Sequence, residues 1–146
     1  FLIIGVVYDR HHTRMVKYYG GLVHTMPIYV MIFLFFTMSN IGLPGTGSFV
    51  GEFLILIGAF KTNIVIAIIS ATGMIIGGCY SLFLFNRVAY GNLKTQYFEH
   101  YLDINKREFF IFAPLILGTL VMGIYPNIWL ECIHFSVNTL IEIMYF

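Results

Sequence analysis

The sequence predicts an all-α fold, a polytopic transmembrane helix bundle with one discontinuous helix. The first observation is composition, because 59% of the 146 residues are hydrophobic and only 10% are charged. A soluble domain of this size carries about 25% charged residues and exposes about 30% of its unfolded-chain surface, so it cannot hide this much apolar surface. The second observation is that long apolar runs alternate with short polar segments, which is typical of a chain that crosses a bilayer repeatedly.

Composition and cysteine usage also exclude several kinds of protein. The net charge of +1 argues against a nucleic-acid partner, and the hydrophobic content argues against a disordered tail. Cys79 and Cys132 are too few for a disulfide framework, and Cys79 fits its apolar run as a small hydrophobic residue. No Cys/His spacing resembles a metal site, and no glycine-rich loop follows a strand. We therefore expect no metal or cofactor in this chain.

The helix boundaries follow from the apolar runs. We expect a helix end at 1–8, a broken span at 26–60, spans at 63–86 and 108–125, and an interfacial helix at 127–146. A spanning helix needs about 20 apolar residues, so the second and third spans qualify directly. Because the chain opens inside an apolar stretch and has no initial Met, we interpret it as the C-terminal piece of something longer.

The apolar run within 26–60 is too long for one straight crossing, since 33 helical residues cover about 50 Å. It could form a hairpin of two short spans or one span broken at 42–47. One broken span places seven of the eight basic residues on the same side, whereas a hairpin divides them four and four. The positive-inside rule favours one broken span, with 10–24 and 87–108 on the cytoplasmic or matrix side.

The expected last helix, 127–146, has a different character. Its polar residues recur at helical spacing and form one stripe on an otherwise apolar helix, which indicates an element lying in the membrane interface. The stripe consists of Glu131, His134, Asn138 and Glu142. Trp129 lies where an aromatic belt is expected.

Glu52 is the residue that most strongly indicates chemistry. Of the seven carboxylates, it alone lies inside an apolar run. An acidic side chain at the centre of a spanning helix costs about 2.5–3.5 kcal/mol on insertion, so such residues are rare and usually functional. We interpret Glu52 as a proton-transfer group. The alternative is a static, hydrogen-bonded Glu that holds two helices together.

The interruption beside Glu52 supports the functional interpretation. Pro44, Gly45, Thr46 and Gly47 predict a helix break, because Pro lacks an N–H and glycine leaves helical geometry easily. Broken backbone at membrane depth is tolerated where it is buried in protein or lines a wet cavity. The hydroxyls of Thr46 and Ser48 are candidates for holding water there. The alternative is a proline kink that serves packing alone.

Two further sets of residues have weaker signals. Gly73, Gly77 and Ser81 place small residues on one helix face, which predicts close helix packing. His12 and His24 lie among basic residues, either as solvated loop residues or as the entry of a proton path.

Several motifs together resemble a known family. They are Tyr8-Asp9-Arg10, the segment 43–53 (Leu-Pro-Gly-Thr-Gly-Ser-Phe-Val-Gly-Glu-Phe), Asn86-Arg87 and the segment 123–126 (Gly-Ile-Tyr-Pro). The chain resembles, over essentially all its residues, the antiporter-like chains of the proton-pumping NADH:ubiquinone oxidoreductase, respiratory complex I. Glutamate at position 52 favours chain 4 over chains 2 and 5, which have lysine at the equivalent position.

The resemblance implies the C-terminal part of an antiporter-like subunit. Residues 28–60 would then be its broken twelfth helix, and Glu52 the terminal proton-transfer acid. The enzyme would be NADH:ubiquinone reductase, with FMN, iron–sulfur clusters and ubiquinone in other subunits and no redox chemistry here. Implied partners are a segment or chain carrying the N-terminal helices, antiporter-like chains 2 and 5, other membrane-arm subunits and membrane lipids.

Two alternatives to proton translocation stay open from the sequence. The chain could be a structural wedge that holds membrane-arm subunits together, or a subunit of a multi-chain sodium/proton antiporter. The high Phe, Ile and Tyr content is typical of an AT-rich organellar genome and favours the mitochondrial inner membrane.

Overall fold

The computed structural model describes residues 1–93 and 102–145, and all regular structure within them is helical. Lys94, one of the basic residues used to predict topology, lies outside the described residues. The predicted all-α class is confirmed. The elements are α1 (Leu2–His11), η1 (Val16–Tyr18), η2 (Leu22–His24), α2 (Pro27–Ile41), α3 (Gly47–Thr62), α4 (Ile64–Ala89), α5 (Lys106–Ile124) and α6 (Asn127–Tyr145).

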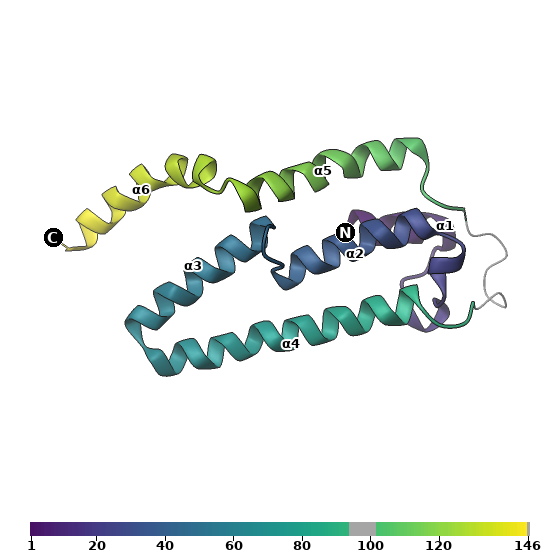
Figure 1. The fold of residues 1–146 in the computed structure, drawn as a ribbon, viewed down its shortest axis with the longest axis horizontal. Coiled ribbons are helices and arrows are strands. Elements are labelled where there is room, and N and C mark those ends of the chain that lie inside the picture. Colours follow the sequence, from purple (N-terminus) through teal and green to yellow (C-terminus); the bar gives the residue numbers. More distant parts are fainter. Residues whose placement is uncertain (94–101, 146) are drawn as a thin grey trace.

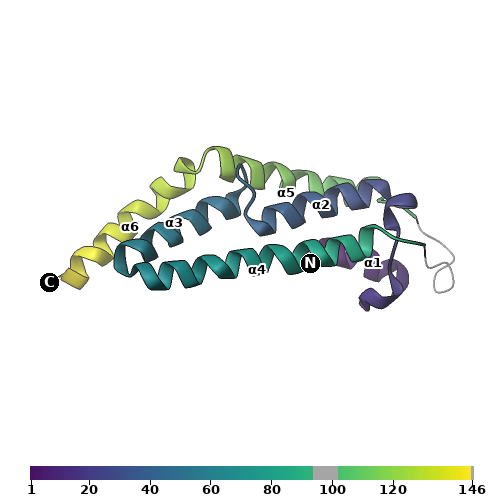
Figure 2. The same cartoon turned by 60° about the horizontal axis from the view of Figure 1, so that its bottom comes forward.

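The long apolar run forms one broken crossing. Helices α2 and α3 lie end to end, and both contact the continuous helix α4 that runs back beside them (Figures 1 and 2). A hairpin would have folded α3 back along α2. At 1.5 Å per residue α4 is about 39 Å long, which exceeds the hydrocarbon thickness of a bilayer. Helices α4 and α5 are both long and apolar enough to cross a membrane.

The corner between α3 and α4 is made by a single residue. The Asn63 side chain accepts hydrogen bonds from the N–H groups of Val65 and Ile66, at 2.9 and 3.4 Å. These groups have no partner inside the helix, so the amide oxygen caps the start of α4. The cap lets the chain reverse direction immediately after α3.

Helix ends in the polar flanks differ from the expected ones. α1 continues to His11 rather than residue 8, and α4 continues to Ala89 rather than residue 86. α5 begins at Lys106, two residues early, because Asn105 and Glu108 form a reciprocal capping box. Apolar periodicity marks the part of a helix inside the bilayer, whereas caps set the ends outside it.

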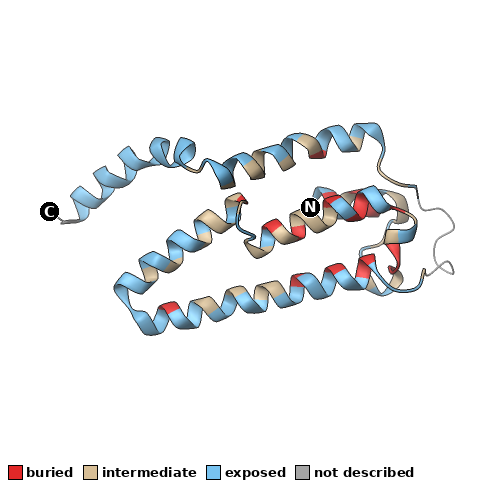
Figure 3. Cartoon of the chain, viewed as in Figure 1, coloured by how far each residue is buried: buried red, intermediate tan, exposed pale blue. Residues whose placement is uncertain are grey.

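Most of the buried residues lie at one end of the bundle (Figure 3). This packed end combines α1, η1 and η2 with the start of α2 and the end of α4. Leu22 and Met26 are the largest fully buried side chains among the described residues. Within the described residues, neither α3 nor α6 has a buried residue, and α6 extends away from the bundle (Figure 1). The interfacial placement of α6 stays a prediction.

Candidate functional site at the helix break

The break between α2 and α3 is a short loop built on two glycines with positive φ. α2 ends at Gly42, with φ +84°, whose N–H donates to the carbonyls of Met38 and Ser39. Gly45 has φ +95°, which side chains other than glycine rarely adopt. The buried Thr46 hydroxyl donates to the Leu43 carbonyl at 2.7 Å. The predicted break is present, but the Thr46 hydroxyl closes the loop and its donor is already engaged.

Helix α5 covers one side of this loop. A β-carbon on Gly123 would overlap the backbone of Gly45 and Thr46, so the two backbones meet directly. A β-carbon on Gly47 would lie 3.0 Å from Cβ of Met122. The broken backbone is therefore buried against protein on the α5 side, as interrupted helices at membrane depth require.

Glu52 lies on the second turn of α3, and its carboxyl group folds back over the end of α2. A β-carbon on Gly42 would overlap Oε2 of Glu52. The Glu52 side chain as a whole is partly exposed, but Oε2 has no accessible surface and no hydrogen-bond partner within the described residues. A buried polar atom without a partner is uncommon and calls for water or another ligand.

Glu52 also lines a cavity of about 350 Å³ between α2, α3 and α4. The other polar lining residues are Asn40, Ser70 and Tyr80, which supply amide and hydroxyl groups. A water molecule occupies about 30 Å³ in the liquid and needs two to four polar partners, so a cavity of this size and polarity suits several waters. The acid and the space for water are brought together by three helices.

The small residues on α4 face this cavity. Gly73 and Gly77 line it, a β-carbon on Gly73 would meet nothing within 4 Å, and one on Gly77 would meet only the Tyr80 ring at 3.9 Å. Within the described residues, a close approach occurs at Gly78, where Cγ2 of Ile41 lies 3.4 Å from a β-carbon position, and a packing role for Gly73 and Gly77 stays a prediction. Ser81 bonds within its own helix, to the carbonyls of Gly77 and Gly78.

The predicted proton-entry residues lie elsewhere. His12 and His24 are both exposed, and neither lines the Glu52 cavity. His12 ends α1 with a left-handed φ of 52° and packs edge-on against Tyr8. Burial, together with the neighbouring Arg10 charge, lowers the pKa of His11. The role of His12 and His24 as a proton entry stays a prediction.

A polar cluster at the packed end joins three helices, and sequence reasoning missed it. Arg10 Nη2 donates to Glu108 Oε2 at 2.8 Å and to the Asp103 carbonyl at 3.0 Å. The Asp103 carboxylate accepts from the N–H groups of Ile28 and Tyr29 at the start of α2. Asp103 and Glu108 lie in a polar segment, and no local sequence pattern pairs them with Arg10, which is more than 90 positions away.

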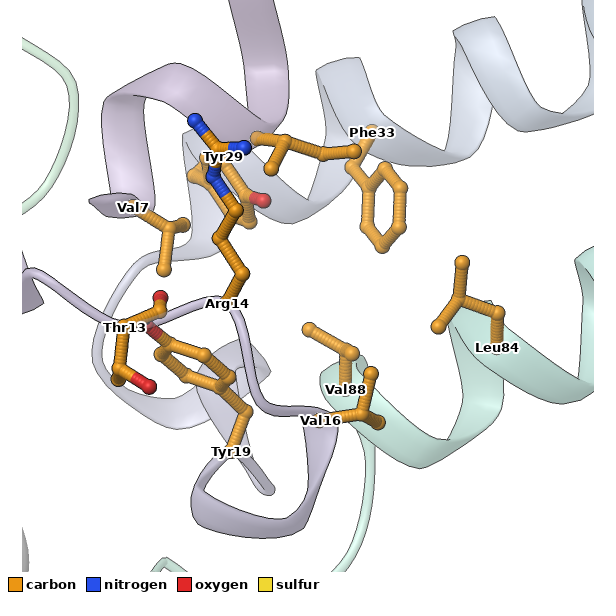
Figure 4. A pocket seen from close by; sticks show the side chains of 10 residues that line it. Val7, Thr13, Arg14, Val16, Tyr19, Tyr29, Phe33, Leu84 and Val88 are labelled. Atoms are coloured by element: carbon orange, nitrogen blue, oxygen red, sulfur yellow. The ribbon is translucent and has the colours of Figure 1, made fainter. Parts of the chain in front are cut away.

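A separate pocket of about 130 Å³ lies at the same end (Figure 4). Thr13, Arg14 and Tyr19 gather on its loop side, while Phe33 and Leu84 stand opposite. The Arg14 guanidinium lies 4.7 Å from the centre of the Tyr8 ring, in a cation–π contact. The lining is mainly apolar and does not include Glu52, so this pocket is distinct from the cavity at the break.

These observations define a class: a polytopic α-helical membrane protein with a half-buried acid at a broken helix. Residues 1–77 match the family model described as NADH:quinone oxidoreductase/Mrp antiporter, transmembrane. The chain belongs to this family.

The structure adds Gly42, Asn40 and Tyr80 to the predicted site residues. Of these, Gly42 could have been found from the sequence, since glycine just past an apolar helix marks its C-terminal cap.

Individual relatives agree with the family match. The chain is 56% identical over 142 residues to NADH-ubiquinone oxidoreductase chain 4 of Marchantia polymorpha, covering 97% of this chain and 29% of that protein. Subunit M of the NADH-quinone oxidoreductase of Rhodobacter capsulatus is 47% identical, with 97% and 28% covered. The resemblance to complex I chain 4 is thereby confirmed, and the match falls in a C-terminal portion of these relatives.

A solved structure has the same helix arrangement. Respiratory complex I from Thermus thermophilus with bound NADH contains a chain that superposes with a TM-score of 0.77 at 28% identity. The match covers 90% of this chain and 27% of that one. The present chain thus spans less than a third of the proteins to which it is similar.

Proposed function

We propose that this chain forms part of a proton-translocating, antiporter-like subunit in the membrane arm of NADH:ubiquinone oxidoreductase, and that Glu52 transfers the proton. The observation that carries the proposal is the Glu52 carboxyl, which has a buried oxygen without a partner among the described residues and lines a polar cavity at a helix break. A purely structural Glu would have its oxygens satisfied by neighbouring donors.

The geometry suits uptake and release of a proton by a carboxyl group. Water in the cavity would be held by Asn40, Ser70 and Tyr80, and would deliver a proton to Glu52 or accept one from it. Gly42 lets the carboxyl approach the end of α2 closely, because a side chain there would exclude it. Intramembrane carboxylates facing a hydrated space form proton relays in pumps and transporters.

The setting of this step is also a proposal. The names of the relatives support a place in NADH-ubiquinone oxidoreductase. From the sequence resemblance we infer the mitochondrial inner membrane as the location, and as neighbours a segment or chain carrying the N-terminal helices and the antiporter-like chains 2 and 5. In that assembly FMN, iron–sulfur clusters and ubiquinone would belong to other subunits. This chain would contribute proton transfer and no electron transfer.

The test is the proton-to-electron ratio of the assembled enzyme in sealed vesicles. Glu52→Gln keeps the shape of the side chain but removes the exchangeable acid, so it should leave assembly intact and abolish coupled pumping through this subunit. Glu142→Gln, on the exposed face of α6, is the matched control and should leave the ratio unchanged.

Two results would contradict the proposal. A normal ratio in Glu52→Gln would mean that Glu52 only holds helices together, as in a structural wedge. Co-purification of the chain in a complex without flavin and iron–sulfur subunits would place it instead in a sodium/proton antiporter.

A further inference from the structure

The start of α2 is capped by a residue from a distant part of the chain. The Asp103 carboxylate accepts hydrogen bonds from the N–H groups of Ile28 and Tyr29, both at 3.1 Å. Helix N-termini leave such groups without partners, and a side-chain cap contributes about 1 kcal/mol. The residue at the ordinary capping position, Met26, makes no side-chain bond. Asp103 therefore supplies the side-chain cap that α2 lacks locally.

Asp103 is itself held from two directions. Its carboxylate accepts from the N–H of Ile104 at 2.7 Å, and its carbonyl accepts from Arg10 at 3.0 Å. Arg10 also pairs with Glu108 at 2.8 Å, with side chains only 14% and 17% exposed. Such a sheltered pair is screened less than a surface ion pair. We call Arg10, Asp103 and Glu108 the clamp, which ties α1, α2 and α5 together.

The other end of α2 carries the site. α2 is a helix of about 22 Å, and its last residue is followed by Gly42, against which the Glu52 carboxyl lies. α5, which begins just after Asp103, ends at the break, where Gly123 meets Gly45. Asp103 and α5 therefore fix α2 at its start and at the break. A helix moves largely as a unit, so a shift at its start displaces Gly42.

We propose that Asp103 and Arg10 are positioning residues for Glu52, acting through α2 from the far end of the broken helix. The clamp holds α2 in the register that places Gly42 under the Glu52 carboxyl and leaves the cavity open beside it. The proposal deepens the proton-transfer role above and rests on it for its functional consequence. The positional consequence stands independently, because it concerns only where the carboxyl lies.

The experiment uses the assembled enzyme in vesicles and measures two quantities. One is the rate at which a hydrophobic carbodiimide modifies Glu52, followed by the mass of the Glu52 peptide. The other is the proton-to-electron ratio. Losing a cap of ordinary strength shifts the equilibrium between the held and the displaced α2 about fivefold. Because the displaced helix no longer holds the Glu52 carboxyl against Gly42, Asp103→Ala should raise the modification rate by up to that factor and should lower the ratio. Asp103→Asn, which keeps one acceptor oxygen, should fall between.

Asp9→Ala is the matched control, because it removes an exposed carboxylate at the same end without uncapping α2. It should change neither quantity. If Asp103→Ala prevents assembly, Asp103→Asn and Arg10→Lys test the same contacts more gently. Normal assembly with an unchanged modification rate in Asp103→Ala would overturn the inference. If the rate rises but Glu52→Gln pumps normally, the positioning holds and the proton-transfer proposal fails.

Discussion

The two halves of the broken helix are both apolar, but they have different surroundings. α2 buries five side chains (Tyr29, Val30, Ile32, Thr37 and Ser39), and its start is capped by Asp103. α3 contacts α4 and α5, yet none of its residues is buried within the described part of the chain. The two halves therefore differ in anchoring, and α2 is also the more apolar of the two.

This contrast shows that the helix that anchors the site, α2, is not the helix that carries the acid, α3. The packed half has a capped helix start and a close-packed apolar core, which make it stiff. The open half carries the acid, and its outward face needs lipid or another chain. A carboxyl that exchanges protons needs room for water, so it belongs on the half where packing is incomplete. The Glu52 carboxyl on α3 is then held in position by α2 and α5.

The largest effect is expected where α5 meets the break. Gly123→Ala would place a methyl group against the backbone of Gly45, which cannot rotate away as a side chain would. We expect the free energy of unfolding to fall by about 3 kcal/mol or more, the upper end of the range for overpacking. The measurement is the thermal midpoint of the assembled complex, which should be lower. Gly118→Ala is the control on the same helix, because its β-carbon would meet nothing within 4 Å. Equal midpoints would show that the break is not supported by α5.

A loss of comparable size should follow truncation in the packed half. Leu22 is fully buried, whereas Leu54 on α3 is 47% exposed. Leu22→Ala should cost about 2–5 kcal/mol, the range for a buried leucine, and Leu54→Ala clearly less. Thermal release of the chain from the complex measures both. An equal cost at Leu54 would break the contrast and would mean that another chain packs tightly over α3.

The smallest effect on stability, but a clear one on activity, is expected at the cavity. Gly73→Leu should fill part of the space beside Glu52 and lower the proton-to-electron ratio. It should leave assembly near normal, because none of the described residues lies within 4 Å of a β-carbon at position 73. Gly58→Leu is the control, since its β-carbon is equally free and Gly58 does not line the cavity. If Gly73→Leu instead prevents assembly, Gly73 serves helix packing, as its spacing suggested.

Much of the fold could be predicted because lipid imposes simple rules. The apolar runs, the positive-inside bias and the Pro/Gly interruption indicated one broken crossing, and α2 and α3 lie end to end as that required. Glu52 stood out because a lone acid in an apolar run is costly. A packing role for Gly73 and Gly77 stays a prediction, because small residues at helical spacing can border either a neighbouring helix or a cavity.

The sequence by itself determined which segments are apolar helices, where the long one breaks and which acid lies beside the break, because these depend on local composition and backbone chemistry. The tertiary structure alone decided that Glu52 lies over Gly42, that α5 covers the break and that Asp103 caps α2 from 75 residues away. Those contacts join distant parts of the chain, and only the packing of whole helices brings them within reach.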